Sequence, residues 1–191
     1  MRLFAGLGNP GPAYAGHRHN VGFMAVDAIA AAHGFPPWRA RFRGLASEGR
    51  LGDTRVLLLK PMTFMNESGQ SVGEALRFLK LAPAALTVFH DELDLPPFRV
   101  KVKTGGGAAG HNGIRSIIAH VGPGFERVRI GIGHPGDRDR VTPHVLGDWA
   151  KAEARPLAAL LADIAELAPL LAAGEPLRFM NDLARRQGQG D

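Results

Sequence analysis

Hydrophobic positions along the chain follow two patterns: short apolar runs, and segments in which apolar residues recur at every third or fourth position. The apolar runs are rich in Val, Leu, Ile and Phe and predict strands near residues 2–7, 40–46, 55–60, 86–91, 98–104 and 127–133. The helical spacing predicts helices at residues 21–28, 72–79, 111–118, 157–167 and 177–186. Strands and helices therefore alternate along most of the chain.

This alternation predicts an α/β fold, with a mixed twisted β-sheet covered by helices on both faces. Antiparallel pairing is expected where two strands follow one another directly. No internal repeat or low-complexity tract divides the sequence, so residues 1–191 are expected to form a single domain. The last two predicted helices are interpreted as packing helices, with a place beside a substrate groove as the alternative.

Composition narrows the class of protein. The chain has 191 residues, of which 45% are hydrophobic, enough to bury one substantial core. No apolar run approaches the roughly 20 residues that span a bilayer, and the first residues lack a signal-peptide pattern, so a cytoplasmic protein without a membrane partner is expected. The absence of cysteine excludes disulfides, a thiol nucleophile and cysteine metal sites. We expect a monomer.

Positive charge is clustered within a formal net charge of +5. Four Lys or Arg residues and no acid occur between Arg99 and Arg115, and five arginines face only Glu48 and Asp53 between Arg39 and Arg55. A solvated basic surface is one explanation of such clusters. Their density favours the other, a polyanionic partner such as nucleic acid.

Two cationic strands and a glycine loop form the strongest of these clusters. Cations alternate with valines along one predicted strand and again along the last, so each set shares one face of its strand: Arg99, Lys101 and Lys103, then Arg127 and Arg129. Residues 105–110 form a glycine-rich loop that leads into a helix and lacks the Lys-Ser/Thr of a P-loop. The pattern predicts phosphate contact without nucleoside triphosphate hydrolysis.

Candidate chemistry is concentrated where strands join helices. His19 lies between the first strand and the first helix, where an imidazole can serve as a catalytic base. Asp91 is one of three carboxylates at the end of an apolar strand, either a solvated turn or the partner of His19. Asn66 either caps a helix or binds a substrate carbonyl, and Met65 is either core or pocket wall.

Two other interpretations of these junctions are weaker. Residues 6–11 match the G-x-G-x-x-G dinucleotide fingerprint, but Pro10 and Pro12 prolong a turn where that motif opens a helix. The glycines are better explained as a sharp turn that brings Asn9 to the mouth of a site. His17, His19 and the His90-Asp91 pair lack any standard zinc spacing, so we expect no metal.

Blocks at these junctions form an ordered series from residue 3 to about residue 150: Gly8-Asn9-Pro10-Gly11, Arg18-His19-Asn20, Lys60-Pro61-Met62-Thr63-Phe64-Met65-Asn66, His90-Asp91, Gly110-His111-Asn112-Gly113 and Gly131-Ile132-Gly133-His134-Pro135. Together they resemble the bacterial peptidyl-tRNA hydrolase family. The resemblance implies an esterase that cleaves the bond between a peptide's C-terminus and the 3′-terminal ribose of tRNA, without cofactor or covalent intermediate. A non-enzymatic RNA-binding module is the alternative.

The resemblance also implies roles for individual residues. His19 is similar to a general base that activates water, Asp91 to its orienting partner, and Asn9 to an amide that stabilises oxyanion charge. The implied substrate-binding residues are Tyr14, Met65, Asn66, His111 and Asn112, and the implied clamp on the tRNA 5′-phosphate is Lys103 with Arg129. Three positions depart from the usual family pattern, namely His17, Ala109 and His144.

Overall fold

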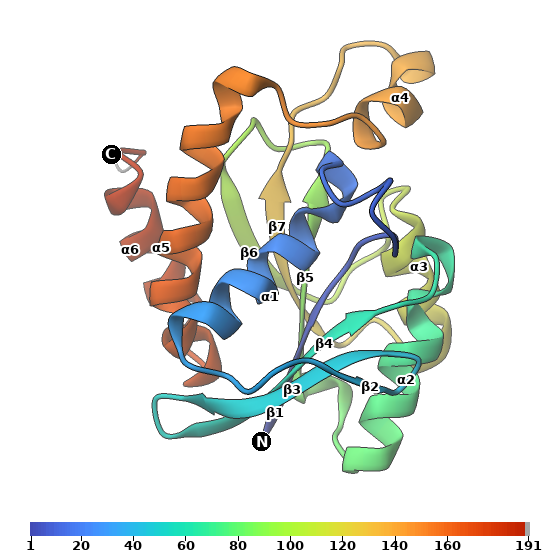
Figure 1. The fold of residues 1–191 in the computed structure, drawn as a ribbon, viewed down its shortest axis with the longest axis vertical. Helices are drawn as coiled ribbons and strands as arrows, with labels where there is room; N and C mark the ends of the chain where they lie inside the picture. Colours follow the sequence, from blue (N-terminus) through green and yellow to red (C-terminus); the bar gives the residue numbers. More distant parts are fainter. Residues whose placement is uncertain (190–191) are drawn as a thin grey trace.

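The computed structural model describes residues 1–189 and contains one seven-stranded sheet, with strand order β2-β3-β4-β1-β5-β7-β6 (Figure 1). The strands are β1 (Arg2–Gly6), β2 (Arg39–Arg41), β3 (Gly44–Leu51), β4 (Thr54–Pro61), β5 (Leu86–Glu92), β6 (Val100–Thr104) and β7 (Glu126–Gly131). The central strands β4, β1, β5 and β7 are parallel, and the outer strands pair antiparallel. The predicted mixed α/β sheet is confirmed.

Helices cover both faces of this sheet. They are α1 (Val21–Ala32), α2 (Ser68–Leu79), α3 (Asn112–Val121), α4 (Val141–Val145), α5 (Ala154–Ala172) and α6 (Pro176–Arg186). One hydrophobic core joins the sheet to α1, α5 and α6, and a second joins its other face to α2 and α3. The central strands are buried on both faces and are therefore rich in apolar residues, as in β5, where six of seven residues are buried and the polar residues His90 and Asp91 lie near its end.

Glycines allow α1 to approach the sheet closely. A Cβ at Gly6 would lie 2.2 Å from the carbonyl oxygen of Gly22, and a Cβ at Gly22 would lie 2.3 Å from the carbonyl oxygen of Phe89. Because α1 begins only at Val21, well after Gly11, the glycine-rich turn does not open a helix as a dinucleotide fingerprint does. The turn instead places the residues after β1 against the start of α1.

Two features of the fold differ from the sequence prediction, and a third decides between the two interpretations of the last two helices. Residues 40–46 are not one strand, because Phe42 and Arg43 form a turn with φ of 56° and 53° between β2 and β3. The short helix α4 was not predicted. The helices α5 and α6 pack on the α1 side of the sheet, and neither contributes to the cleft described below. Among residues 1–189, no helix combines the length and apolar character needed to cross a bilayer.

Candidate active site

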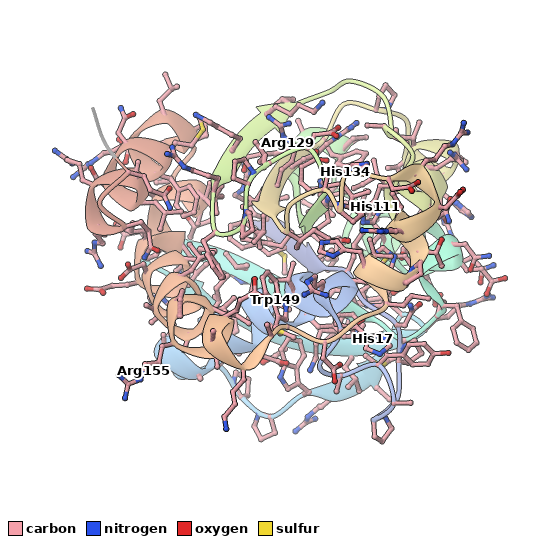
Figure 2. All side chains as sticks on the ribbon, turned by 90° about the horizontal axis from the view of Figure 1, so that it is seen from above. His17, His111, Arg129, His134, Trp149 and Arg155 are labelled. Atoms are coloured by element: carbon pink, nitrogen blue, oxygen red, sulfur yellow. The ribbon has the colours of Figure 1, made fainter. Side chains whose placement is uncertain are left out.

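A cleft of about 580 Å³ opens at the carboxyl ends of the parallel strands, and Figure 2 looks onto this end of the sheet. The loops after β1 and β4 and the helix α4 form its walls. Its lining residues are Asn9, His19, Phe64, Met65, Asn66, Glu67, Asn112, Thr142, Val145 and Leu146. A smaller cavity of about 240 Å³ shares His19 and Asn112 with the cleft and reaches Asp91 and His111. Open α/β sheets bind ligands at this end.

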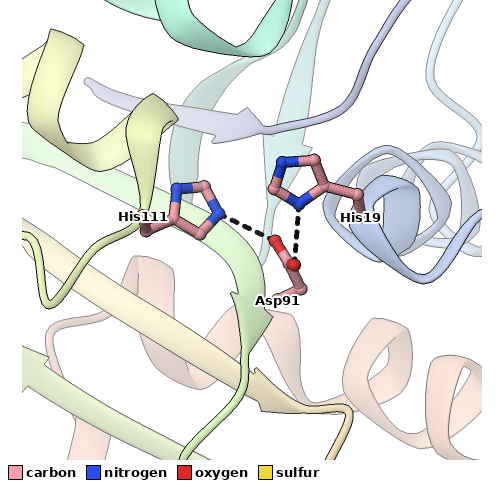
Figure 3. Close-up of side chains that lie close together, drawn as sticks. All are labelled: His19, Asp91 and His111. Atoms are coloured by element: carbon pink, nitrogen blue, oxygen red, sulfur yellow. Dashed lines mark hydrogen bonds and ion pairs between the residues drawn. The ribbon is translucent and has the colours of Figure 1, made fainter. Parts of the chain in front are cut away.

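Asp91 is the centre of the site and binds two histidines (Figure 3). Its Oδ2 lies 2.7 Å from His19 Nδ1, and its Oδ1 lies 2.7 Å from His111 Nε2. The carboxylate is buried at the end of β5, His19 lies in the 3-10 helix Arg18–Asn20, and His111 directly precedes α3. The sequence prediction paired Asp91 with His19 but did not anticipate the bond to His111.

The hydrogen bonds assign the protons on both rings. His111 Nδ1 accepts from the backbone N–H of Ile114 at 3.2 Å and so caps α3, which leaves the His111 proton on Nε2, where it donates to Asp91. His19 donates from Nδ1 to the same carboxylate. The unprotonated Nε2 of His19 then faces away from Asp91 (Figure 3) and has the lone pair of a general base.

The charge of Asp91 depends on these two partners. Burial by itself would raise the pKa of the Asp91 carboxyl, but the charges and hydrogen bonds of His111 and His19 outweigh burial and hold the pKa well below its usual range. Asp91 is therefore ionised at neutral pH. An ionised carboxylate stabilises the imidazolium that forms when His19 takes up a proton.

His90 lies directly beneath this centre and is neutral. Burial, followed by the proximity of His111, lowers the pKa of His90 to about 3. Its Nδ1 donates to the backbone carbonyl of Asp91 at 2.8 Å, and its ring centroid lies 4.9 Å from that of His111. The sequence pattern suggested His90 only as a weak candidate for a metal ligand. In the structure it contacts Asp91 and His111, which bind each other.

Asn9 is fixed by a hydrogen-bond network that includes Asn20. The Oδ1 of Asn9 accepts from the backbone N–H of Met65 at 2.8 Å. Asn20 is fully enclosed, and its side chain accepts from Asn9 N and donates to Asn9 O, each at 2.9 Å. Because the Asn9 oxygen is occupied, its NH₂ group is the part available to a ligand. Asn20 had no predicted role, since its burial cannot be seen in the sequence.

The other predicted substrate-binding residues differ in their distance from the cleft. Met65, Asn66 and Asn112 line it, and the backbone N–H of Met65 holds Asn9. Tyr14 is not among the lining residues, but its ring packs edge-on against Phe64 at 6.4 Å between centroids. Phe64, 55% exposed, supplies an apolar wall that the sequence analysis included in a motif without assigning a role.

Lys103 and Arg129 lie on the adjacent strands β6 and β7. Register pairs Lys103 with Arg127 and Lys101 with Arg129, so the two predicted clamp residues are diagonal neighbours on one face of the sheet. Arg129 lies 3.7 Å from Glu92, and Lys103 is exposed. Arg127 does not belong to this exposed surface as the sequence suggested, because its side chain is buried and binds backbone carbonyls.

The three positions that depart from the family pattern surround the cleft. His17 lies 4.0 Å from Asp148, beside the connection that follows α4. The Nε2 of His144, within α4, lies 3.0 Å from the carbonyl oxygen of Ile132. Ala109 has a φ of 48° and lines the smaller cavity. None of the three replaces a residue that contacts Asp91.

Among residues 1–189, His19, Asp91 and His111 place potential ligand atoms within 4.8 Å of one another. A metal would require a lone pair on the nitrogen that faces it. The lone pair of His111 is on Nδ1, where it caps α3, and its Nε2 carries the proton shared with Asp91. The donor set therefore fits a hydrogen-bonded centre better than a cation site. His17, the other candidate, approaches Asp148 instead of this group.

A buried carboxylate that holds an imidazole beside amide groups, in a cleft of an α/β sheet, is the arrangement of an enzyme that uses histidine as a general base. A family model described as peptidyl-tRNA hydrolase matches residues 3–190. The chain belongs to the peptidyl-tRNA hydrolase family.

Individual relatives agree with this assignment. The chain is 63% identical over 186 residues to the peptidyl-tRNA hydrolase of Rhizorhabdus wittichii, covering 97% of this chain and 98% of the relative. It is 64% identical over 187 residues to that of Novosphingobium aromaticivorans, covering 98% of each. A crystal structure of peptidyl-tRNA hydrolase from Acinetobacter baumannii superposes with a TM-score of 0.90 at 43% identity, covering 96% of this chain and 94% of that one. The predicted family resemblance is confirmed.

Proposed function

We propose that the cleft hydrolyses the ester between a peptide's C-terminal carbonyl and the 3′-terminal ribose of tRNA, using water activated by His19. The observation that carries this proposal is the pair of 2.7 Å contacts from Asp91 to His19 and His111 at the cleft. They hold His19 in the tautomer whose Nε2 can accept a proton. The chain has no cysteine nucleophile, and the proposal needs no covalent intermediate.

The reaction then has two proton transfers. His19 Nε2 takes a proton from water as the water oxygen attacks the ester carbonyl, and Asp91 stabilises the resulting imidazolium. The NH₂ group of Asn9 donates to the developing oxyanion. When the tetrahedral intermediate collapses, the imidazolium returns its proton to the departing 3′-oxygen of the ribose. General base catalysis typically contributes ~10²- to 10⁴-fold, and one oxyanion donor ~10²- to 10³-fold.

The walls of the cleft suggest how the peptide is held. Asn66 and Asn112 both line the cleft and can hydrogen-bond a peptide backbone, which carries both donors and acceptors. Met65 and Phe64 provide apolar surface that tolerates different side chains. Tyr14 acts in this proposal through Phe64, against which its ring packs.

The tRNA end of the substrate is assigned to the cationic strands. The 5′-phosphate and the 3′ end of a tRNA lie at the same end of its acceptor stem, so a site for the ester has the phosphate nearby. Lys103 and Arg129 share one face of β6 and β7, and a phosphate is a strong acceptor for both an ammonium and a guanidinium. In this proposal the enzyme acts as a cytoplasmic monomer without metal or cofactor.

Ester cleavage tests the proposal directly. The protein is incubated with an N-acetyl-aminoacyl-tRNA, and release of the N-acetyl-amino acid is followed with and without a chelator. Turnover that the chelator does not change is expected. Binding of the tRNA without turnover would favour the RNA-binding module, and turnover lost only with chelator would overturn the metal-free mechanism.

A further inference from the structure

Arg127 on β7 is a buried arginine beside the proposed phosphate clamp. Its side chain is 1% exposed, although Arg129, two residues later on the same face, reaches the surface. The guanidinium donates to the carbonyl oxygens of Gly107 at 2.5 Å, Gly106 at 2.8 Å and Pro123 at 3.1 Å. It also packs against the ring of Phe125, 4.4 Å from the centroid. Arg127 thus joins the glycine-rich loop to the connection between α3 and β7.

Burial of a charged arginine without a carboxylate partner costs free energy. Within residues 1–189 no carboxylate lies within ion-pair distance of Arg127, and its charge faces backbone carbonyls and the ring of Phe125. Burial, and then the charge of Arg129, lowers the pKa of Arg127, yet a guanidinium remains protonated at neutral pH. A neutral side chain would pack more easily at this position. We therefore attribute the arginine at this position to its hydrogen bonds with the three backbone carbonyls.

Gly106 connects Arg127 to Lys103. Lys103 is the register partner of Arg127 across β6 and β7. Gly106 has a φ of +94°, and a Cβ built there would lie 3.2 Å from Lys103 Nζ. The Lys103 ammonium therefore lies close to the Cα of Gly106, and the carbonyl oxygen of Gly106 accepts a hydrogen bond from Arg127.

We propose that Arg127 is a positioning residue that fixes Gly106 and thereby places the Lys103 ammonium for phosphate binding. The inference rests on the proposed clamp of Lys103 and Arg129. An exposed lysine beside a flexible loop would lose side-chain entropy on binding a phosphate. A loop whose Gly106 and Gly107 carbonyls are held by Arg127 gives the ammonium a defined support, so the phosphate meets a cation already in place.

Gly106→Ala tests this without disturbing the core. The added methyl group displaces the ammonium and strains the positive φ, while Arg127 stays buried. Arg127→Lys is the second variant, since a single ammonium nitrogen on a different side chain replaces the two guanidinium nitrogens that reach these carbonyls. Gly174→Ala is the matched control, because Gly174 also has a positive φ, of +77°, lies between α5 and α6, and has nothing within 4 Å of its Cβ position. Each protein is assayed for kcat and KM on an N-acetyl-aminoacyl minihelix with either a 5′-phosphate or a 5′-hydroxyl.

We expect the parent and Gly174→Ala to have a KM about tenfold lower for the 5′-phosphate substrate, the effect of one charge-assisted contact. In Gly106→Ala and Arg127→Lys this preference should fall to about twofold or less, with KM for the 5′-hydroxyl substrate and kcat unchanged. A retained preference in a folded Gly106→Ala protein would overturn the role of Arg127. Equal KM values in the parent protein would overturn the clamp itself, and with it this inference.

Discussion

The proposed catalytic centre and the cationic strand pair, Lys103 and Arg129 on β6 and β7, belong to one sheet but are built in opposite ways. Asp91 is 3% exposed, and each of its oxygens has a histidine partner at 2.7 Å. Lys103 is exposed, and Arg129 has only a 3.7 Å contact with Glu92. One region is enclosed and hydrogen-bonded, and the other is open to solvent and loosely paired.

This difference indicates which kinetic step each region controls. Groups fixed in a low-dielectric environment need no reorganisation when charge develops, so the centre should act on kcat. Exposed cations are screened by salt and attract a polyanion before any bond is broken, so the strand pair should act on KM.

Removing His19 should have the largest effect. His19→Ala is expected to lower kcat by ~10²- to 10⁴-fold, because the proposed general base is lost, with little change in tRNA affinity. Turnover kinetics and a tRNA-binding titration measure the two quantities. His120→Ala, an exposed histidine on α3, is the control. Near-normal kcat in a folded His19→Ala protein would show that another group is the base.

Asp91→Asn tests whether the carboxylate acts through both histidines. Asparagine offers one carbonyl oxygen where two imidazole N–H groups donate, so its NH₂ group opposes one ring and forces that ring into another tautomer or position. We expect kcat to fall by ~10²-fold or more. Asp94, an exposed residue in the turn that follows β5, provides the control variant Asp94→Asn. An unchanged kcat would contradict the assignment of Asp91 as the partner of His19.

The strand pair should give a smaller effect of a different kind. Lys103→Ala combined with Arg129→Ala is expected to raise KM by about tenfold or more and to flatten its dependence on salt, with kcat nearly unchanged. Steady-state kinetics at several salt concentrations measure both. Arg50→Ala with Arg55→Ala removes the same charge from exposed positions on β3 and β4. If that control raised KM equally, general charge, and not the clamp, would explain the effect.

The sequence indicated which residues form the enclosed centre better than it indicated the contacts between them. His19, Asp91 and Asn9 could be found because each follows or precedes a clear strand or helix signal. Asn20 and the second bond of Asp91 could not, since both depend on burial and on contacts between segments far apart in the chain. A motif locates a polar residue, but its partners come from tertiary packing.

The errors in the fold have similar local causes. Phe42 and Arg43 form a tight turn with positive φ, although neither residue has the glycine or asparagine signature of such turns. The helix α4 has five residues, too few for a periodic pattern. Arg127 follows the same alternation as Arg129, and only the loop above it distinguishes a buried arginine from an exposed one. Alternation with a period of two predicts the face of the strand on which a residue lies, but not whether the residue is buried.

The effect predicted for stability arises from a third histidine, His90, that is buried beside the centre. The unfolded chain protonates His90 near pH 6.5, but the folded chain protonates it only near pH 3, so the unfolded state binds more protons between these values. The free energy of unfolding should therefore have its full value above about pH 6.5. Below that pH it should fall, with a contribution from His90 of up to roughly 1.4 kcal/mol per pH unit.

His90→Asn keeps a donor for the Asp91 carbonyl but cannot titrate, so it isolates this contribution from that of the other histidines. Its unfolding free energy should be lower than that of the parent at pH 7.5, because a smaller side chain leaves a cavity, and should decline less on acidification to pH 5. Urea unfolding at both pH values measures the difference. Equal declines of the unfolding free energy in the two proteins would mean that His90 is protonated in the folded protein. The centre around Asp91 would then be less enclosed than its contrast with the exposed strand pair requires.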